Sequence, residues 1–298
     1  MKRTISFFIA ALMSIAIVAI PALAASTVSL IDPLSGSFSR GDVPIRWSYS
    51  GFHPSAQIAV EAAPDGTNFI SIATVNIDDG TPGNYGSTSW STGTWPDSAS
   101  YVLRVRVIVN SQAQSSIPMT IDNTAPVVTG AGRTAPNASG WNNEDVAVTW
   151  ICNDATSGVV APTVDSSVTS EGAGQTATSA CTDRAGNVTP TSAGGINIDK
   201  TSPILLVNAL PAVGLGPVDR ITGTLADSLS GTSGVSVTFR NTVLGTSVIR
   251  SSTCSSCAGA WSWEVPTEGL LPGHYEVSVD GTDIADNVSS FTGSLLIL

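Results

Sequence analysis

The chain has 298 residues, carries a formal net charge of −11 and is 42% hydrophobic, with only 12% charged side chains. A surface with this excess of acidic residues repels phosphate backbones, so nucleic acid is not an expected partner. The hydrophobic content is sufficient for packed cores and argues against a disordered chain.

The first residues have the features of an export signal. Lys2 and Arg3 precede an apolar run from about Ile5 to Ile20, and Ala22-Leu23-Ala24 matches a cleavage site. We therefore expect residues 1–24 to be removed, rather than kept as a membrane anchor. Nothing later has the ~20 apolar residues that a spanning helix needs, so we expect a mature chain without a transmembrane segment, secreted or associated with the cell surface.

The segment from 25 to 122 has the pattern of one β-sandwich. Runs in which apolar and polar residues alternate, such as Val43–Trp47 and Tyr101–Val107, predict half-buried strands. Asp65-Gly66-Thr67 lies between two further runs and predicts a hairpin turn. This segment contains no cysteine, so its apolar core would have to stabilise it alone.

The phrase Ile-Asp-x-Thr-x-Pro occurs twice, starting at Ile121 and at Ile198, about 77 residues apart. This interval suits one small sandwich, and the segments on either side show the same strand-and-turn pattern. We therefore expect an all-β chain of three tandem immunoglobulin-like β-sandwiches, over residues 25–122, 123–200 and 201–298. The proline in each short linker favours extended conformations, so the three modules should form a rod.

The middle module, residues 123–200, has the pattern that a bridged sandwich requires. Cys152 shares one strand face with Trp150, and Cys181 shares a face of a later strand with Ala177. Both cysteines therefore face one core, as in the bridge between strands B and F of an immunoglobulin-like sandwich. We expect a disulfide that closes a loop of about 30 residues and stabilises the module by roughly 3.6 kcal/mol.

The last module, residues 201–298, repeats the middle module at two loops. Thr182–Thr189 aligns with Thr282–Ser289, and Asp154–Gly158 aligns with Asp227–Gly231. Glycine and asparagine at these positions supply the unusual φ values that tight turns need. The two modules should therefore share their turns as well as their strands.

Cys254 and Cys257 form a second pair of cysteines. An exported protein meets an oxidising compartment, so we expect these two to be joined by a disulfide. The Cys-x-x-Cys spacing also occurs in redox centres and zinc sites, but no βαβ pattern surrounds this pair and no second Cys or His pair accompanies it. We expect a bridge at the tip of a hairpin, with no catalytic role.

These residues resemble two extracellular families. The Ile-Asp-x-Thr-x-Pro linkers, Gly140-Trp141-Asn142-Asn143 and Asp183–Asn187 make the middle and last modules similar to the bacterial Ig-like repeats of cell-surface and secreted proteins. The first module resembles the N-terminal Ig-like domain of Ser/Thr-rich surface proteins, through Ile45-Arg46-Trp47 and Ser100–Val105. Asp286 departs from the repeat pattern, which usually has glycine there. The resemblance implies a structural or adhesive role and names no ligand.

Six aspartates are candidate metal ligands. In an immunoglobulin-like module the incoming linker, the B–C loop and the F–G loop lie at one pole, which would gather three carboxylates at each junction. The two sets are Asp122, Asp154 and Asp183, and then Asp199, Asp227 and Asp283. Carboxylates with loop carbonyls are suitable ligands for Ca²⁺, which would stiffen the chain. Alternatively, each aspartate caps its own turn through backbone N–H groups.

Trp90 and Trp95, together with Tyr101, are candidates for a carbohydrate-binding platform on the first module, because sugar rings stack on exposed aromatic faces. The alternative is that Trp90 belongs to the core and that Trp95 packs against Pro96 at its rim. Exposure of both tryptophans on one face would distinguish the two arrangements.

Sequence motifs for catalysis are absent. The chain has no Gly-x-Ser-x-Gly, His-Glu-x-x-His or phosphate-cradling glycine-rich motif, and its two histidines, His53 and His274, fall in different modules. We therefore expect an exported, non-enzymatic modular rod for adhesion or binding, with a cell-surface protein or polysaccharide as partner. The alternative is a carbohydrate-binding accessory module of an extracellular polysaccharide-processing system.

Overall fold

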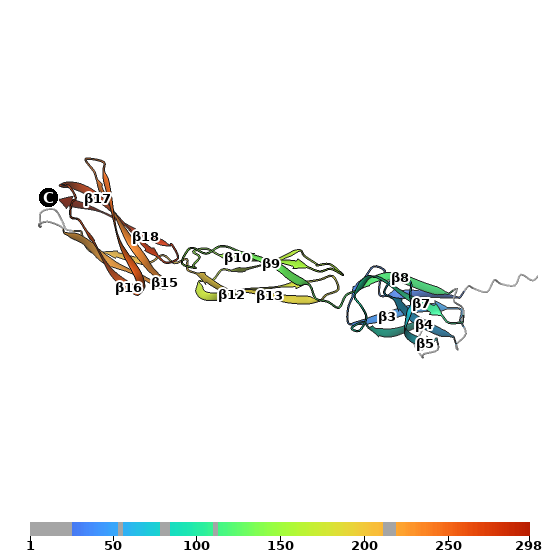
Figure 1. The fold of residues 1–298 in the computed structure, drawn as a ribbon. Coiled ribbons are helices and arrows are strands. Elements are labelled where there is room, and N and C mark those ends of the chain that lie inside the picture. Colours follow the sequence, from blue (N-terminus) through green and yellow to red (C-terminus); the bar gives the residue numbers. More distant parts are fainter. Residues whose placement is uncertain (1–25, 53–55, 78–83, 110–112, 211–218) are drawn as a thin grey trace, which may run out of the picture. The chain divides into compact units, whose positions relative to one another are not determined.

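The computed structural model describes residues 26–52, 56–77, 84–109, 113–210 and 219–298 (Figure 1). The expected export signal and His53 lie outside the described residues. Within them the chain is all-β, as expected. No helix among the described residues is long and apolar enough to cross a membrane.

The chain divides into two compact units by its contacts. One ends at Thr120, and the other runs from Ile121 to Leu298 together with Phe38–Arg40, which include the short strand β2 (Phe38–Ser39). The second unit contains both the middle and the last module. The division of the chain into three modules at the expected boundaries therefore stays a prediction.

The first unit consists of two facing sets of strands. One sheet has the order β1-β3-β6, and the other contains the order β8-β7-β4-β5. The strands of the first sheet are β1 (Thr27–Asp32), β3 (Asp42–Ser50) and β6 (Tyr85–Ser91). The strands of the second are β4 (Gln57–Ala63), β5 (Ile70–Asn76), β7 (Ser98–Val107) and β8 (Gln114–Ile121).

The core of the first unit follows from the alternation of its strands. On β3, Ile45 and Trp47 point inward and are at most 1% exposed, while Arg46 between them faces solvent. Gly86 on β6 lies opposite Trp47, and a Cβ atom there would meet the indole ring at 2.5 Å. Only glycine therefore lets β6 approach the tryptophan this closely.

A partly buried network of ion pairs supports the first unit, which has no cysteine. The Glu61 carboxylate on β4 accepts hydrogen bonds from both Arg104 and Arg106 on β7, the shortest at 2.7 Å from each. The Arg104 guanidinium also stacks 3.5 Å from the centre of the Phe69 ring. Hydrogen bonding from Arg106 lowers the pKa of Glu61 in spite of its burial, so the carboxylate stays charged.

The middle module has two small sheets. Their orders are β11-β10-β9 and β12-β13. The strands are β9 (Val127–Arg133), β10 (Val146–Asn153), β11 (Thr163–Val168), β12 (Gly172–Thr182) and β13 (Val188–Ile198). Trp150 on β10 packs with Ile196 and Ile198 of β13 in one hydrophobic cluster. The expected bridge between Cys152 and Cys181 is present, with a Cα–Cα distance of 5.7 Å, and both cysteines are buried.

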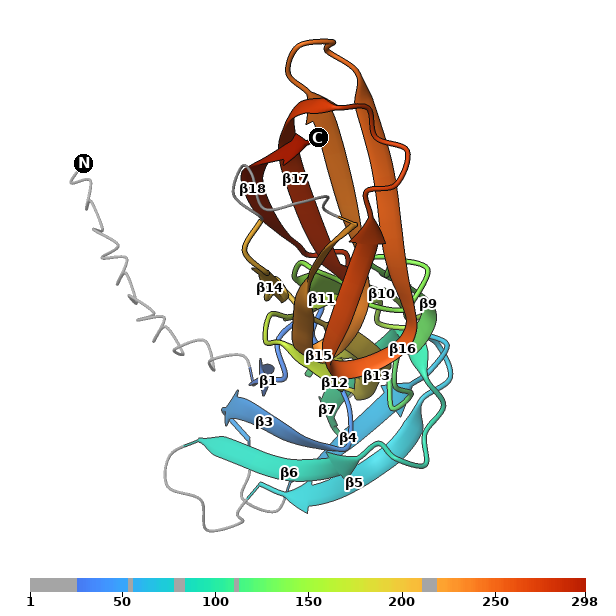
Figure 2. The ribbon, with the colours of Figure 1, turned by 90° about the vertical axis from the view of Figure 1, so that its left-hand side faces the viewer.

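The last module is one curved set of strands, seen from two sides in Figures 1 and 2. Its sheet has the order β14-β15-β17-β18, with β16 paired to β15. The strands are β14 (Ile204–Val207), β15 (Arg220–Asn241), β16 (Ser247–Pro266), β17 (Gly273–Asp283) and β18 (Val288–Ile297). Phe239, Trp263 and Val277 lie at the centre of its core, each at most 2% exposed.

The Cys254–Cys257 disulfide is present, but its expected position at a hairpin tip is wrong. The turn between β15 and β16 lies at 242–246, whereas the disulfide lies within β16. The pairing with β15 shifts between Thr253 and Cys257, so the bridged residues form a bulge. The bulge accommodates residues that have no counterpart on the facing strand.

We predict that replacing Cys152 and Cys181 together with alanine destabilises the middle module by about 2–4 kcal/mol, because their bridge closes the longer loop. Replacing Cys254 and Cys257 together should cost less, about 2 kcal/mol, since that loop has only four residues. Hydrogen exchange followed by mass spectrometry would report each module separately. Equal losses for the two double variants would contradict this order.

Candidate functional site

Three aspartates meet where the linker enters the middle module. Asp122 follows β8, Asp154 follows β10, and Asp183 follows β12. One carboxylate oxygen from each lies within 4.8 Å of the others, and Asp122 and Asp183 are buried. The expected gathering of these three residues is confirmed, and we call them the first aspartate cluster.

Asp199, Asp227 and Asp283 form a second aspartate cluster, where the next linker enters the last module. Their carboxylate oxygens also lie within 4.8 Å of one another, and all three side chains are buried. The three residues occupy the same places in the repeat as those of the first cluster. The repeated sequence therefore builds the same arrangement twice.

Backbone N–H groups supply most of the hydrogen bonds to the first cluster. Asp122, in the linker, accepts from Thr124 N at 3.1 Å and from Ser157 N at 3.0 Å. Asp154 uses one oxygen for a turn, and Ser157 N and Gly158 N each donate to it at 2.9 Å. Asp122 of the linker and Asp154 of the B–C loop, which lies between β10 and β11, thus share the N–H group of Ser157.

The second cluster repeats these contacts. Asp199 accepts from Thr201 N at 3.1 Å and from Ser230 N at 2.9 Å. Asp227 accepts from Leu229 N at 3.0 Å and from Gly231 N at 2.7 Å. The capping role that the sequence offered as an alternative is therefore present at both clusters.

Asparagine side chains connect each cluster to its linker, which the sequence analysis did not anticipate. Asn187 Nδ2 donates to Asp183 Oδ2 at 2.7 Å and to the carbonyl of Asp122 at 2.8 Å. Asn287 Nδ2 donates to Asp283 Oδ2 at 2.7 Å and to the carbonyl of Asp199 at 2.8 Å. The spacing Asp-x-x-x-Asn was the available signal, and it occurs in the F–G turn of each module, between β12 and β13 and between β17 and β18.

Burial makes the charged carboxylates costly. Desolvation raises the pKa of the Asp122 carboxyl, and it likewise raises that of Asp283. Among the described residues, no salt bridge reaches any of the six carboxylates. The nearby N–H groups are therefore the main source of compensation that the chain itself provides.

The two clusters meet part of what a calcium ion requires. Ca²⁺ bonds to oxygen at 2.3–2.6 Å, so two of its ligands lie at most about 5 Å apart, and the carboxylates satisfy this limit. However, the ion takes six to eight oxygens, and both oxygens of Asp122 and of Asp183 already accept N–H groups. Binding of Ca²⁺ stays a prediction.

Of the two arrangements open for Trp90 and Trp95, the structure favours the one in which Trp90 belongs to the core. Trp90 is 2% exposed, because it lies opposite the buried Val43 on β3 and points into the core of the first unit. Trp95 packs edge-on against Trp90, with ring centres 5.1 Å apart. The hydroxyl of Tyr101 donates to the carbonyl of Pro96 at 2.8 Å, which fixes the third ring. Trp90 and Tyr101 are buried and Trp95 is half-buried against them, so the three rings do not offer the two exposed faces that a sugar platform needs.

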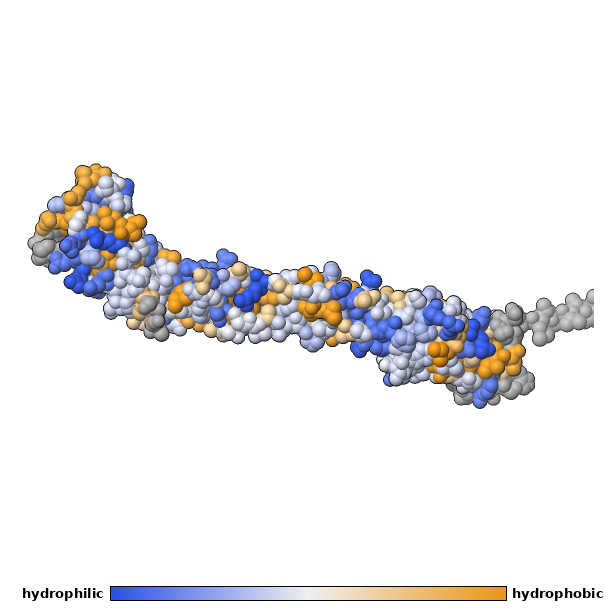
Figure 3. All heavy atoms as spheres, viewed as in Figure 1, coloured by the Kyte–Doolittle hydropathy of each residue, from blue (hydrophilic) through white to orange (hydrophobic). Residues whose placement is uncertain are grey.

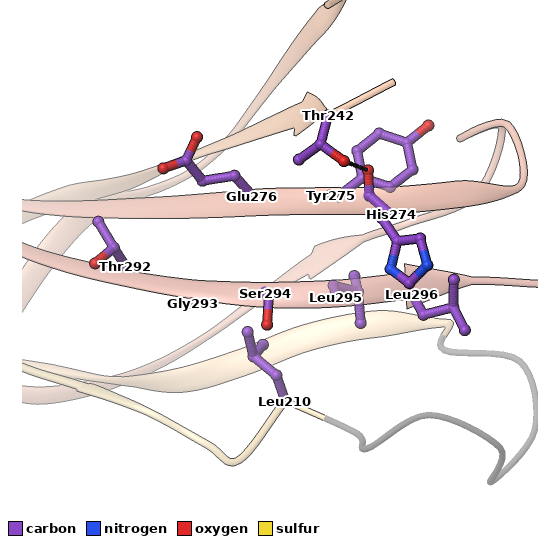
Figure 4. A pocket seen from close by; sticks show the side chains of 10 residues that line it. All are labelled: Leu210, Thr242, His274, Tyr275, Glu276, Thr292, Gly293, Ser294, Leu295 and Leu296. Carbon is purple, nitrogen blue, oxygen red and sulfur yellow. Dashed lines mark hydrogen bonds between the residues drawn. The ribbon is translucent and has the colours of Figure 1, made fainter. Parts of the chain in front are cut away.

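A hollow of about 760 Å³ lies on the last module, beside β17 and β18 (Figure 4). His274 and Glu276 line it from β17, and Thr292 and Ser294 line it from β18. The hydrogen bond drawn between lining residues joins the Thr242 hydroxyl to the carbonyl of His274, so it does not involve the imidazole ring. This hydrogen bond therefore leaves the orientation of the imidazole ring unaffected.

The same end of the last module exposes apolar side chains. Figure 3 shows hydrophobic surface there, where the turn between β15 and β16 carries Val243 and Leu244, 80% and 57% exposed. Single exposed apolar residues are common on protein surfaces. They identify no ligand.

We predict that Asn187→Ala destabilises the middle module by about 2–4 kcal/mol, because two buried acceptors, Asp183 Oδ2 and the carbonyl of Asp122, lose their donor. Asn287→Ala should do the same to the last module. Asn208→Ala is the matched control, since Asn208 is exposed and its side chain donates to the Thr222 hydroxyl on the surface. Urea unfolding with module-resolved hydrogen exchange measures all three, and a loss at Asn187 no larger than at Asn208 would contradict the assigned role.

The calcium prediction has a direct measurement. If the clusters hold Ca²⁺, calorimetric titration of residues 25–298 will show uptake at millimolar concentration, and the double variant Asp154→Asn, Asp227→Asn will bind more weakly. The amide oxygen of the variant can still accept the turn N–H groups, while one potential anionic ligand is lost from each cluster. An absence of uptake would leave capping as the role of the clusters.

No family model matches the chain, and no curated protein does. Among solved structures, the chain is similar to a tetra-tandem repeat from the extending region of a large adhesion protein, at 17% identity over 91% of this chain and 74% of that chain, with a TM-score of 0.29. A 1.5-MDa bacterial ice-binding adhesin gives 16% identity, 92% and 97% coverage and a TM-score of 0.32. The Escherichia coli adhesin FdeC gives 13% identity, 92% and 96% coverage and a TM-score of 0.37. Scores this low do not establish a shared function.

Proposed function

We propose that this chain is an exported, non-enzymatic protein that acts at the cell surface as a modular spacer and displays an adhesive or binding surface. The observation that carries the proposal is the repeated attachment of linker to module. At both junctions an aspartate of the linker is buried in the module that follows it and hydrogen-bonded to two of its loops. A chain that only needed to tether independent domains would not require this burial.

The attachment also indicates which hydrogen bonds would resist a pulling force on the linker of the last module. To detach Asp199 from the last module, the chain must break the bonds from Asn287 Nδ2 to its carbonyl and from Ser230 N to its carboxylate. Ser289 adds a hydrogen bond from its hydroxyl to the carbonyl of Pro203. Several partly buried bonds must therefore break together, which suits a protein that holds two surfaces at a distance.

The chemistry of the surface fits an extracellular setting. The chain is acidic, and both pairs of cysteines are joined in disulfides, which persist in oxidising compartments. The partner we propose is a protein or polysaccharide of a cell surface. The lack of catalytic sequence motifs supports a role without enzymatic activity.

Small-angle X-ray scattering of the mature chain tests the spacer. An extended arrangement of three modules, each roughly 35 Å long, approaches 100 Å and has a radius of gyration near 29 Å. One globule of this length would have a radius of gyration near 19 Å, and that result would contradict the proposal. An antibody against the mature chain should also label intact cells of the source organism, which tests surface display separately.

A further inference from the structure

Asp286 has an unusual backbone conformation for its residue type. Its φ is +70°, in the left-handed region, and it is the one non-glycine residue with positive φ among the described residues. The equivalent position of the middle module is Gly186, whose φ is +90°. Glycine adopts this region without steric cost, whereas aspartate does not. The F–G turn itself therefore gives no reason for aspartate at this position.

The side chain of Asp286 has a partner in the other module. Asn137, in the loop between β9 and β10 of the middle module, donates through Nδ2 to Asp286 Oδ2 at 2.8 Å and to the carbonyl of Ile284 at 2.8 Å. The Oδ1 atom of Asn137 accepts from Ser139 N and Trp141 N, both at 3.0 Å. Because these bonds hold Oδ1 toward its own loop, the Nδ2 atom of the amide faces the last module.

The linker between the middle and last modules makes polar contacts with both of them. Lys200 forms an ion pair with Asp145 of the middle module, and Glu171 of the same module accepts from Lys200 N at 2.6 Å and from the Thr201 hydroxyl at 2.8 Å. The preceding residue, Asp199, belongs to the buried cluster of the last module. Consecutive linker residues are therefore held by different modules.

We propose that the middle and last modules form one rigid pair, and that the contact of Asn137 with Asp286 and Ile284 is the latch that sets their relative orientation. Asp286 replaces glycine at a left-handed position because its carboxylate completes this latch. The bonds of Lys200 and Glu171 remove the remaining freedom of the linker. The inference concerns the geometry within the second unit and does not depend on what the protein binds.

Residual dipolar couplings from the full mature chain test the latch. In the unaltered protein, one alignment tensor should fit the amide couplings of both modules. Asn137→Asp keeps the Oδ1 acceptor for its own loop but places a carboxylate against Asp286, so the two modules should then need separate tensors. Asp286→Gly should also require separate tensors, while the thermal stability of the last module stays equal or rises, because glycine adopts the positive φ without strain.

The control is Asn208→Asp, which makes the same chemical change on the surface of the last module and should keep the common tensor. Separate tensors in the unaltered protein would overturn the rigid pair. A common tensor in both Asn137→Asp and Asp286→Gly would overturn the latch. A clear loss of thermal stability in Asp286→Gly would show that the aspartate serves its own turn, which also contradicts the inference.

Discussion

One asparagine side chain at each junction holds the linker and the F–G turn together. The amide of Asn187 or Asn287 donates to a buried carboxylate and to the carbonyl of the linker aspartate. The linker carboxylate then accepts an N–H group from the B–C loop. Three segments distant in sequence meet at this point, and the entry of the chain into each module depends on these few polar contacts.

Burying such groups is costly unless every partner is in place. An unsatisfied buried carboxylate or carbonyl loses the hydration it has in the unfolded chain, at about 1–3 kcal/mol for a neutral group and more for a charged one. The raised pKa values of Asp122 and Asp283 reflect this cost. A polar network of this kind tolerates one geometry only, so it specifies the direction in which the linker enters.

The two repeats have the same turns but differ at single positions within and beside them. Gly186 and Asp286 share a left-handed conformation, but only Asp286 carries a side chain that can reach the neighbouring module. Likewise Lys200 follows the linker aspartate at the second junction, whereas Asn123 stands at that place in the first. The repeated sequence thus accounts for the turns that the two modules share. Single differences in that sequence, at Asp286 and Lys200, give the second junction contacts of its own.

Much of the fold could be predicted from the sequence because it follows from local patterns. The alternation around Trp150, the inward direction of Cys152 and Cys181, and the gathering of three aspartates at each junction all follow from the period of a strand and from the repeated phrases. These features need only short stretches of sequence and the common topology of the module. The structure confirms each of them.

The register of the strands and the contact between the middle and last modules were decided by the tertiary structure alone. Trp90 is buried because its strand pairs with β3 in the register that places it opposite Val43, and a shift of one residue would have exposed it. The latch joins Asn137 to a residue 149 positions later, and nothing near either residue marks the pair. The alternation determined which strand faces are buried, and the repeated phrases located the two aspartate clusters. Strand register and the contact between the middle and last modules came only from packing, which no local pattern encodes.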